Sequence, residues 1–198
     1  MTTLQIRQAK AVIREEYKEK RALLSDKIKQ NSTRLISMYL LESVSYKYCK
    51  NILIYSAKKN EVDTYIIANR ALEDKKNVYF PKSYPKGLMR FFKVTDIDAL
   101  HSGKLGIKEP EETVQNEYIL SCESTDLCIV PAVCFDTYGY RIGYGKGYYD
   151  RFLAKFRGIT VGLCFKDCIY HDKLPFEKRY DKAVDIVISE KGLDVIGR

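Results

Sequence analysis

Short apolar segments that alternate with helical patterns constrain the fold of this chain more than any other feature. Runs this short, bounded by turn residues, are typical of strands buried on both faces, which occur mainly in parallel sheets. Because helical segments separate them, we expect an α/β fold of three layers, α/β/α, with a largely parallel central sheet. The runs occupy residues 51–55, 77–80, 127–130, 159–165 and 184–188.

The helical patterns begin at the N-terminus. Residues 4–29 combine a loose apolar stripe with a cationic face, which predicts one long helix. The Asn31-Ser32 pair is expected to break it, with Ser32 capping a second helix over residues 32–48. Further helices are expected over residues 62–74 and 148–156.

A proline and the absence of linkers complete the expected organisation. Pro81 is expected to stop the strand that begins at Asn77, and another strand is expected over residues 88–94. The chain has no Gly/Ser/Pro-rich linker, no internal repeat and no low-complexity tract. We therefore expect residues 1–198 to form a single domain.

The net charge restricts the class of partner. Lys and Arg number 34 and Asp and Glu 26, which gives a formal charge of +8. Such a surplus favours anionic partners: nucleic acid, anionic membranes, phosphate-bearing ligands or polycarboxylates. No apolar run approaches the ~20 residues that span a bilayer, and the N-terminus lacks an apolar signal-peptide core. We expect a soluble, cytoplasmic protein without a membrane partner.

Cysteine and histidine usage argues against several enzyme classes. The six cysteines include no Cys-x-x-Cys pair, so we expect reduced, mostly buried thiols rather than a zinc site. The only histidines are His101 and His171, both in polar segments, which is too few for a histidine-based catalytic metal centre. A G-x-S-x-G nucleophile elbow is also absent, which argues against a serine hydrolase.

A cluster of glycines marks the candidate site. Four of the 11 glycines lie within residues 139–147, between an apolar strand and a helical pattern, where backbone N–H groups can face a phosphate. Arg141 and Lys146 would neutralise its charge, and Asp150 would hold a metal ion. Neither a Walker A nor a G-x-G-x-x-G spacing is present. The spacing alone leaves two alternatives, a phosphate site and a tight turn with a tyrosine-rich packing surface.

The same segment resembles a known signature. Residues 131–153 match every fixed position of the pattern P-x-x-x-F-D-x-x-G-x-R-[LI]-G-x-G-x-G-Y-Y-D-x-x-L of the 5-formyltetrahydrofolate cyclo-ligase family. Weaker matches follow in the family's order, including K-x-x-x-R at Lys10 and Arg14 and E-[VI]-[DE]-T from Glu61. The resemblance covers most of the chain and implies a fold like that of sugar-phosphate isomerases and CoA-transferases.

The resemblance implies a ligase of folate one-carbon metabolism. Its reaction converts 5-formyltetrahydrofolate to 5,10-methenyltetrahydrofolate with ATP and Mg²⁺, releasing ADP and phosphate. Phosphorylation of the formyl oxygen makes it a leaving group, and the folate 10-nitrogen closes the ring. Phosphoryl transfer depends on positioning and charge stabilisation more than on acid–base side chains, which agrees with the scarcity of histidine.

The resemblance also assigns residues. Lys10 and Arg14, four residues apart and therefore on one helix face, would contact ATP. Glu61 would bind the donor edge of the pterin, and Asp150 and Asp185 would hold Mg²⁺. The implied catalytic residues are Lys146, Arg141 and Tyr149. The segment around the ATP phosphates comprises Arg141, Gly143, Tyr144, Gly145, Lys146, Gly147, Tyr148 and Tyr149, of which Tyr144, Gly145, Lys146, Gly147 and Tyr148 would also border the folate.

Other interpretations of these residues remain open. Lys10 and Arg14 also fit a solvated basic face, Glu61 a helix N-terminal acid, and Asp185 a strand-edge carboxylate paired with a lysine. A nucleic-acid-binding module would use the same cations and tyrosines, although no module motif is present. A sugar-phosphate isomerase or transferase relative of the same fold is the other alternative. We expect small-molecule partners, no nucleic acid, and a monomer or weak dimer.

Overall fold

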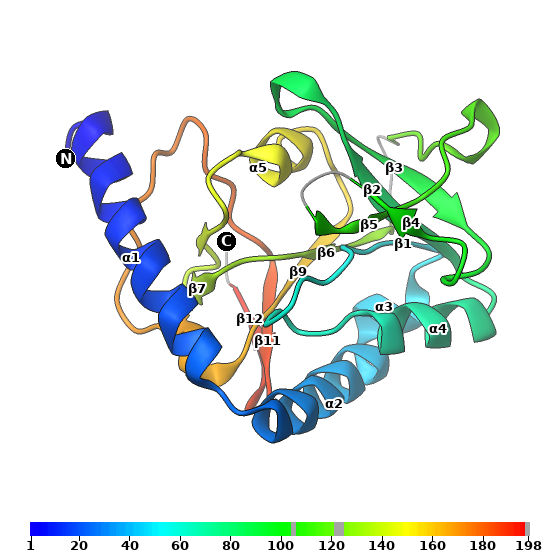
Figure 1. The fold of residues 1–198 in the computed structure, drawn as a ribbon, viewed down its shortest axis with the longest axis horizontal. Helices are drawn as coiled ribbons and strands as arrows, with labels where there is room; N and C mark the ends of the chain where they lie inside the picture. The colour runs from blue at the N-terminus through cyan, green and yellow to red at the C-terminus, as the bar shows by residue number, and fades with distance from the viewer. Residues whose placement is uncertain (104–105, 121–124, 197–198) are drawn as a thin grey trace.

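A seven-stranded sheet forms the centre of the computed structural model, which describes residues 1–103, 106–120 and 125–196 (Figure 1). Its strand order is β12-β11-β9-β6-β1-β2-β3. The inner strands pair in parallel, and each edge strand pairs antiparallel with its neighbour. This confirms the predicted, largely parallel sheet. The strands are β1 (Asn51–Leu53), β2 (Asn77–Ser83), β3 (Met89–Val94), β6 (Leu127–Val130), β9 (Ile159–Leu163), β11 (Ile186–Ser189) and β12 (Gly192–Val195).

Helices cover both faces of this sheet, as the three-layer prediction requires. In Figure 1, α2 (Asp26–Glu42), α3 (Val44–Tyr48) and α4 (Tyr65–Glu73) lie along one side, and α5 (Tyr148–Leu153) lies on the other. The N-terminal helix α1 (Thr3–Leu23) contacts a small sheet formed by β10 (Ile169–Tyr170), β7 (Cys134–Asp136) and β8 (Arg141–Ile142). The remaining elements are β4 (His101–Ser102), β5 (Lys108–Glu109) and the 3₁₀ turns η1 (Pro85–Gly87), η3 (Val114–Asn116) and η4 (Lys166–Cys168).

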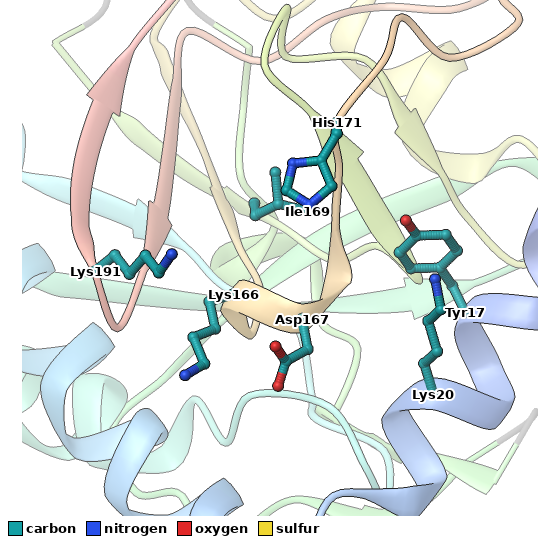
Figure 2. A pocket seen from close by; sticks show the side chains of 7 residues that line it. All are labelled: Tyr17, Lys20, Lys166, Asp167, Ile169, His171 and Lys191. Carbon is teal, nitrogen blue, oxygen red and sulfur yellow. The ribbon is translucent and has the colours of Figure 1, made fainter.

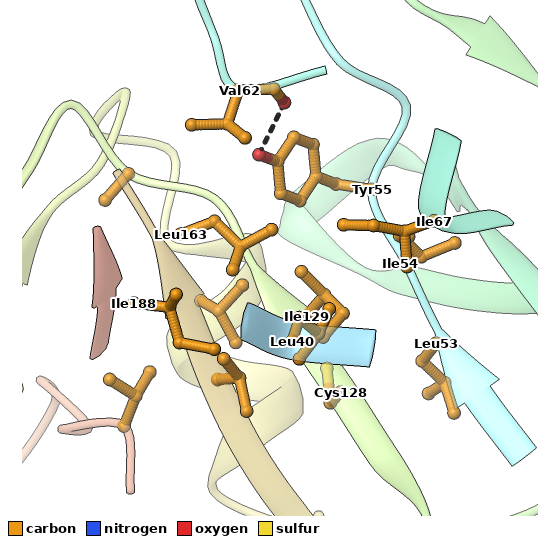
Figure 3. Packing of buried hydrophobic residues seen from close by; sticks show 14 of the residues in the cluster. Leu40, Leu53, Ile54, Tyr55, Val62, Ile67, Cys128, Ile129, Leu163 and Ile188 are labelled. Atoms are coloured by element: carbon orange, nitrogen blue, oxygen red, sulfur yellow. Dashed lines mark hydrogen bonds between the residues drawn. The ribbon is translucent and has the colours of Figure 1, made fainter. Parts of the chain in front are cut away.

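The main core lies between the central sheet and α2 (Figure 3). Leu40 of α2 packs among strand residues such as Ile129 and Ile188, and all three are fully buried. Burial of each such side chain contributes roughly 1.5–3 kcal/mol. Just beyond β1, the Tyr55 hydroxyl donates a hydrogen bond of 2.8 Å to the carbonyl of Val62. This bond ties the segment before α4 to the carboxyl end of β1.

The N-terminal helices break at a different place from the one predicted. The single helix over residues 4–29 is wrong, because α1 ends at Leu23 and Ser25 caps α2 by accepting a hydrogen bond from the Ile28 N–H at 3.3 Å. Ser32 is not a cap. It lies buried inside α2, where its hydroxyl donates to Glu190 at 3.0 Å. The second helix also ends earlier than predicted, since Ser43 ends α2 and caps α3.

Pro81 does not end its strand. The register of β2 pairs Pro81 with Phe91 of β3, and the strand continues to Ser83. The pairing of β2 with β1 ends at Tyr79, so beyond that residue β2 pairs only with β3 among the described strands. A residue without an N–H is tolerated on a strand with one unpaired side.

The thiol prediction holds wherever the structure describes a cysteine. Cys49, Cys128, Cys134, Cys164 and Cys168 are buried and free, and Cys122 lies outside the described residues. Burial raises the pKa of the Cys49 and Cys168 thiols to about 11, so they are protonated at neutral pH. In the described ranges, none of the helices combines the length and apolarity needed to cross a bilayer.

Gly162 in β9 is expected to be intolerant of a side chain. A Cβ on this residue would lie 2.3 Å from Cζ of Phe135, a ring that is fully buried. Gly162→Ala should therefore lower the free energy of unfolding by about 2–3 kcal/mol, measured by urea denaturation. Gly143→Ala is the matched control, because no atom lies within 4 Å of its Cβ position. Equal urea midpoints for the two variants would contradict this account.

Candidate functional site

The glycine loop, defined as residues 143–147, connects β8 to α5. Gly145 and Gly147 have φ values of +89° and +65°, a backbone region that favours glycine. Residues 144–146 are exposed, and their N–H groups donate to no acceptor in the described part of the chain. With only six residues, α5 contributes little dipole. The loop therefore offers backbone donors to an anion mainly through its own N–H groups.

Helix α1 brings one predicted ATP-binding residue directly to this loop. Arg14 Nε donates a hydrogen bond of 2.7 Å to the carbonyl of Gly143, and its guanidinium carbon lies 3.6 Å from the Cβ position of Gly145. Lys10, one turn earlier, forms an ion pair with Asp181, and both side chains are 17% exposed. The interpretation of these two residues as a freely solvated basic face is therefore wrong.

Arg141 and Asp150 form a partly buried ion pair beneath the loop. Arg141 Nη2 donates to Asp150 Oδ1 at 2.7 Å, and Nη1 donates to the Lys182 carbonyl at 2.6 Å. The Arg141 side chain is 4% exposed and that of Asp150 29%. Both hydrogen bonds to Asp150 end on Oδ1, the second coming from the Lys182 N–H at 3.4 Å. The loop is thus anchored to α5 by a charged pair.

Asp185 has different partners from Asp150. It directly precedes β11, and its Oδ2 accepts hydrogen bonds from the Thr160 N–H at 2.9 Å and the Thr160 hydroxyl at 2.6 Å. One of its partners is thus a threonine of β9. In the described ranges, no three His, Cys, Asp or Glu side chains gather as a metal site.

Glu61 is linked to the glycine loop by a hydrogen bond. Glu61 Oε1 accepts from the Tyr144 hydroxyl at 2.8 Å, and Oε2 accepts from the Lys58 N–H at 2.8 Å. Arg21 Nη2 donates to the same Tyr144 hydroxyl at 2.7 Å. Burial and the Glu61 charge raise the pKa of Tyr144 to about 12, so the hydroxyl keeps its proton. Glu61 precedes the α4 cap residue Thr64 and does not act as a helix N-terminal acid.

A narrow crevice lies below this network, at the carboxyl ends of β1, β6 and β9. Its volume is about 10 Å³, enough for one water molecule and far too small for a pterin. The crevice as it stands therefore does not hold a ligand of that size. The lining residues are Arg21, Tyr55, Glu61, Val62, Ala132, Val133, Leu163, Cys164, Phe165 and Cys168.

The remaining predicted residues divide into exposed and buried groups. Lys146 is exposed, and its ammonium forms no ion pair or hydrogen bond with any described residue. The Tyr148 hydroxyl donates to the Tyr84 carbonyl at 3.3 Å. Tyr149 is different, because its hydroxyl is buried without a hydrogen-bond partner among the described residues, and burial raises its pKa well above the usual value. Lys146 is the side chain best placed to meet a ligand.

Several residues of the site were missed by sequence reasoning. Arg21 is 6% exposed and, besides Tyr144, binds the Ala132 carbonyl at 3.0 Å. It follows Arg14 by seven residues, so helical spacing places both on one face and is a usable signal. Arg151 holds the loop by donating to the carbonyls of Gly87, at 2.9 Å, and Lys146. No sequence signal identifies that contact.

Comparison with known proteins shows the family to which the chain belongs. The profile of the 5-formyltetrahydrofolate cyclo-ligase family matches residues 6–190. A probable 5-formyltetrahydrofolate cyclo-ligase of Schizosaccharomyces pombe is 31% identical over 183 residues, covering 85% of this chain and 89% of the relative. The 5-formyltetrahydrofolate cyclo-ligase of Haemophilus influenzae is 29% identical over 186 residues, covering 91% of this chain and 98% of the relative.

Solved structures show the same relationship. The 5,10-methenyltetrahydrofolate synthetase of Aquifex aeolicus superimposes with a TM-score of 0.81 at 30% identity, covering 96% of this chain and 94% of that one. The 5,10-methenyltetrahydrofolate synthetase of Mycoplasma pneumoniae shares the fold, with a TM-score of 0.69 at 22% identity. The superposition covers 91% of this chain and 98% of that one. The glycine-loop resemblance is thereby confirmed, and the chain belongs to the 5-formyltetrahydrofolate cyclo-ligase family.

Proposed function

We propose that this chain converts 5-formyltetrahydrofolate to 5,10-methenyltetrahydrofolate in the cytoplasm, using ATP and Mg²⁺ and releasing ADP and phosphate. One observation carries the proposal. The glycine loop accepts a hydrogen bond from Arg14 at the Gly143 carbonyl and, through the Tyr144 hydroxyl, donates one to Glu61. A single loop thus joins the residues suited to a triphosphate and the carboxylate suited to a pterin.

The triphosphate of ATP fits the loop. The exposed N–H groups of residues 144–146 and the guanidinium of Arg14 supply donors, and Lys146 has no other described partner. Lys10 would also contact the triphosphate from the preceding turn of α1, with its side chain oriented by the ion pair with Asp181. Arg141 is the least accessible of the implied catalytic cations, and in this proposal it holds the loop through Asp150.

Mg²⁺ also fits, through carboxylate oxygen. Asp150 accepts its described hydrogen bonds on Oδ1, so Oδ2 is the oxygen it would offer to the ion. Asp185 would be the second carboxylate, directly or through water, while Thr160 orients it. When bound, the ion would neutralise phosphate charge during transfer.

The folate would bind at Glu61 in place of Tyr144. Pterin N–H donors require an acceptor, and Glu61 Oε1 is now occupied by the Tyr144 hydroxyl. Release of that hydroxyl would free Tyr144 to pack on the pterin while Glu61 stays fixed by the Lys58 N–H. The formyl oxygen would then take the γ-phosphoryl group of ATP, with ADP as the leaving group. Attack of the 10-nitrogen on the formyl carbon would then form the ring, with loss of the proton on that nitrogen and departure of the formyl oxygen as phosphate.

A direct assay tests this function. Purified protein is mixed with 5-formyltetrahydrofolate, and methenyl absorbance is followed with MgATP, with ATP plus EDTA, and without nucleotide. We expect the methenyl absorbance to increase only in the presence of MgATP. No ATP-dependent growth from folded protein would reject the function. A salt-sensitive oligonucleotide shift in its place would favour the nucleic-acid-binding alternative.

Glu61→Gln should affect the folate and not the nucleotide. The amide replaces one acceptor oxygen with a donor and removes the charge, so we expect the KM for 5-formyltetrahydrofolate to rise about 30-fold and the KM for ATP to stay within about twofold. Glu73→Gln is the matched control, because Glu73 is exposed at the end of α4. A rise in KM for ATP alone would remove Glu61 from the folate site.

A further inference from the structure

Arg151 of α5 ties the end of the glycine loop to the turn between β2 and β3. Its Nη2 donates to the Lys146 carbonyl, and its Nε donates to the Gly87 carbonyl at 2.9 Å. The turn, called here the hairpin turn, comprises residues 84–88, which connect β2 to β3. One guanidinium therefore bridges two segments that are distant in sequence.

The conformation of Gly87 leaves room for this side chain. Its φ is +73°, a backbone region that favours glycine, and a Cβ at this position would lie 1.6 Å from Arg151 Nη2. A side chain at this position would therefore push the guanidinium away from the turn. A second bond joins the same elements, because the Tyr148 hydroxyl of α5 donates to the Tyr84 carbonyl at 3.3 Å.

Helix α5 gives Arg151 a fixed base. The next residue, Phe152, packs its ring against the ring of Phe91 in β3, with centroids 4.8 Å apart. Phe91 is fully buried, and Leu153 of α5 is buried as well. The helix is thus anchored to the same hairpin whose turn the guanidinium contacts.

Lys146 has few other restraints. It lies between Gly145 and Gly147, whose φ values are +89° and +65°, and glycine is the residue with the greatest backbone freedom. In the described part of the chain, the Lys146 N–H donates to no acceptor, and Arg151 is the one donor to its carbonyl. The position of Lys146 therefore depends on Arg151.

We propose that Arg151 is a positioning residue for phosphoryl transfer, an inference that rests on the proposed function. By holding the Lys146 carbonyl against the hairpin turn, Arg151 fixes where the Lys146 ammonium meets the transferred phosphoryl group. Phosphoryl transfer depends on placement, and a displacement of about 1 Å can cost a factor of about 10² in rate. In this proposal Arg151 acts through Lys146 and does not itself bind the phosphates.

Variants of Arg151 test this role in the methenyl absorbance assay. Arg151→Ala should lower kcat about tenfold and leave the KM for 5-formyltetrahydrofolate within about twofold. Arg151→Lys should recover part of the rate, because an ammonium makes one of the two bonds and not both. Arg157→Ala removes the same charge from an exposed position after α5 and should keep full activity. Full recovery in Arg151→Lys, or a higher KM for ATP without loss of kcat, would assign Arg151 to the phosphates and overturn the positioning role.

A double-mutant cycle shows whether Arg151 acts through Lys146. In the Lys146→Ala background the ammonium is gone, so adding Arg151→Ala should lower kcat by less than about twofold. A further loss as large as the one in the wild-type background would show that the two residues act independently and would overturn the proposal. An unchanged kcat in Arg151→Ala alone would also overturn it.

Gly87→Ala disrupts the same contact without changing Arg151. The added methyl group takes the place of Nη2, so we expect kcat to fall about tenfold and Arg151→Ala to add little to this loss. Gly106→Ala is the matched control, because Gly106 has a similar φ of +69° and no atom lies within 4 Å of its Cβ position. Equal kcat values in the two glycine variants would contradict the role of the hairpin turn.

Proteolysis tests the anchor without turnover. The endoprotease Lys-C cleaves after lysine, and its attack on the bond between Lys146 and Gly147 needs the carbonyl that Arg151 holds. Arg151→Ala should raise the cleavage rate at this bond about fivefold, measured by mass spectrometry, whereas Arg157→Ala should not. Equal rates in wild type and Arg151→Ala would reject the anchor alone. Absence of MgATP-dependent turnover in the wild type would reject the proposed function, and the positioning role would fall with it.

Discussion

Replacing Lys146 by Ala is expected to lower kcat by about a thousandfold. The Lys146 ammonium has no described partner, lies on the exposed part of the glycine loop, and is the side chain best placed to meet the transferred phosphoryl group. A cation aimed at charge that develops during phosphoryl transfer typically contributes a factor of about 10³. Because this interaction strengthens in the transition state, kcat and kcat/KM should fall together in the methenyl absorbance assay.

Controls separate that effect from changes in folding or net charge. Lys146 is exposed, so the free energy of unfolding of Lys146→Ala, measured by urea denaturation, should stay within about 0.5 kcal/mol of that of the wild type. Lys155→Ala removes the same charge from the turn after α5 and should keep full activity. Lys146→Arg retains a cation and should recover part of the lost rate. A kcat for Lys146→Ala within about threefold of wild type would exclude the catalytic role.

The inner strands were predictable because each segregates apolar residues into a short run. β6 and β11 are buried at every position, and the sequence shows no alternation there. The helix break at Ser25 was not predictable, because Ser25 and Ser32 are both acceptable N-cap residues. In the structure Ser25 is the cap, and Ser32 lies within α2 with its hydroxyl bound to Glu190. Strands of only two residues, such as β8, are too short to show a recognisable sequence pattern.

The candidate site was predictable only where a motif carries it. The glycine loop lies in one continuous segment, so the residues that form it could be named without a structure. The Arg21–Tyr144–Glu61 network joins three segments distant in sequence, and each bond depends on how α1 packs beside β8. A cavity beside α1 likewise draws Lys20, Lys166 and Lys191 from α1, η4 and the β11–β12 turn (Figure 2). Surface lysines carry no sequence signal of such convergence.

Arg141→Leu is expected to cost both stability and turnover. The guanidinium is 4% exposed and binds Asp150 at 2.7 Å and the Lys182 carbonyl at 2.6 Å. The substitution removes both bonds, and Asp150 keeps only the long bond of 3.4 Å from the Lys182 N–H. Breaking such a pair costs 3–5 kcal/mol when both charges are buried, and Asp150 is partly solvated, so we expect about 3 kcal/mol. For a chain of this length the Tm should fall by roughly 6 to 12 °C.

Asp150→Asn distinguishes the ion pair from the proposed metal site. The amide oxygen can still accept from Arg141 Nη2, and Arg141 keeps its bond to the Lys182 carbonyl, so the loss of stability should be smaller than in Arg141→Leu. The neutral amide is a poor Mg²⁺ ligand, so the Mg²⁺ concentration for half-maximal turnover should rise about tenfold or more. Arg141→Lys should recover part of the stability, because an ammonium makes one of the two bonds and not both. If Asp150→Asn lowers the Tm as much as Arg141→Leu and leaves the Mg²⁺ dependence unchanged, Asp150 serves the loop as an anchor alone.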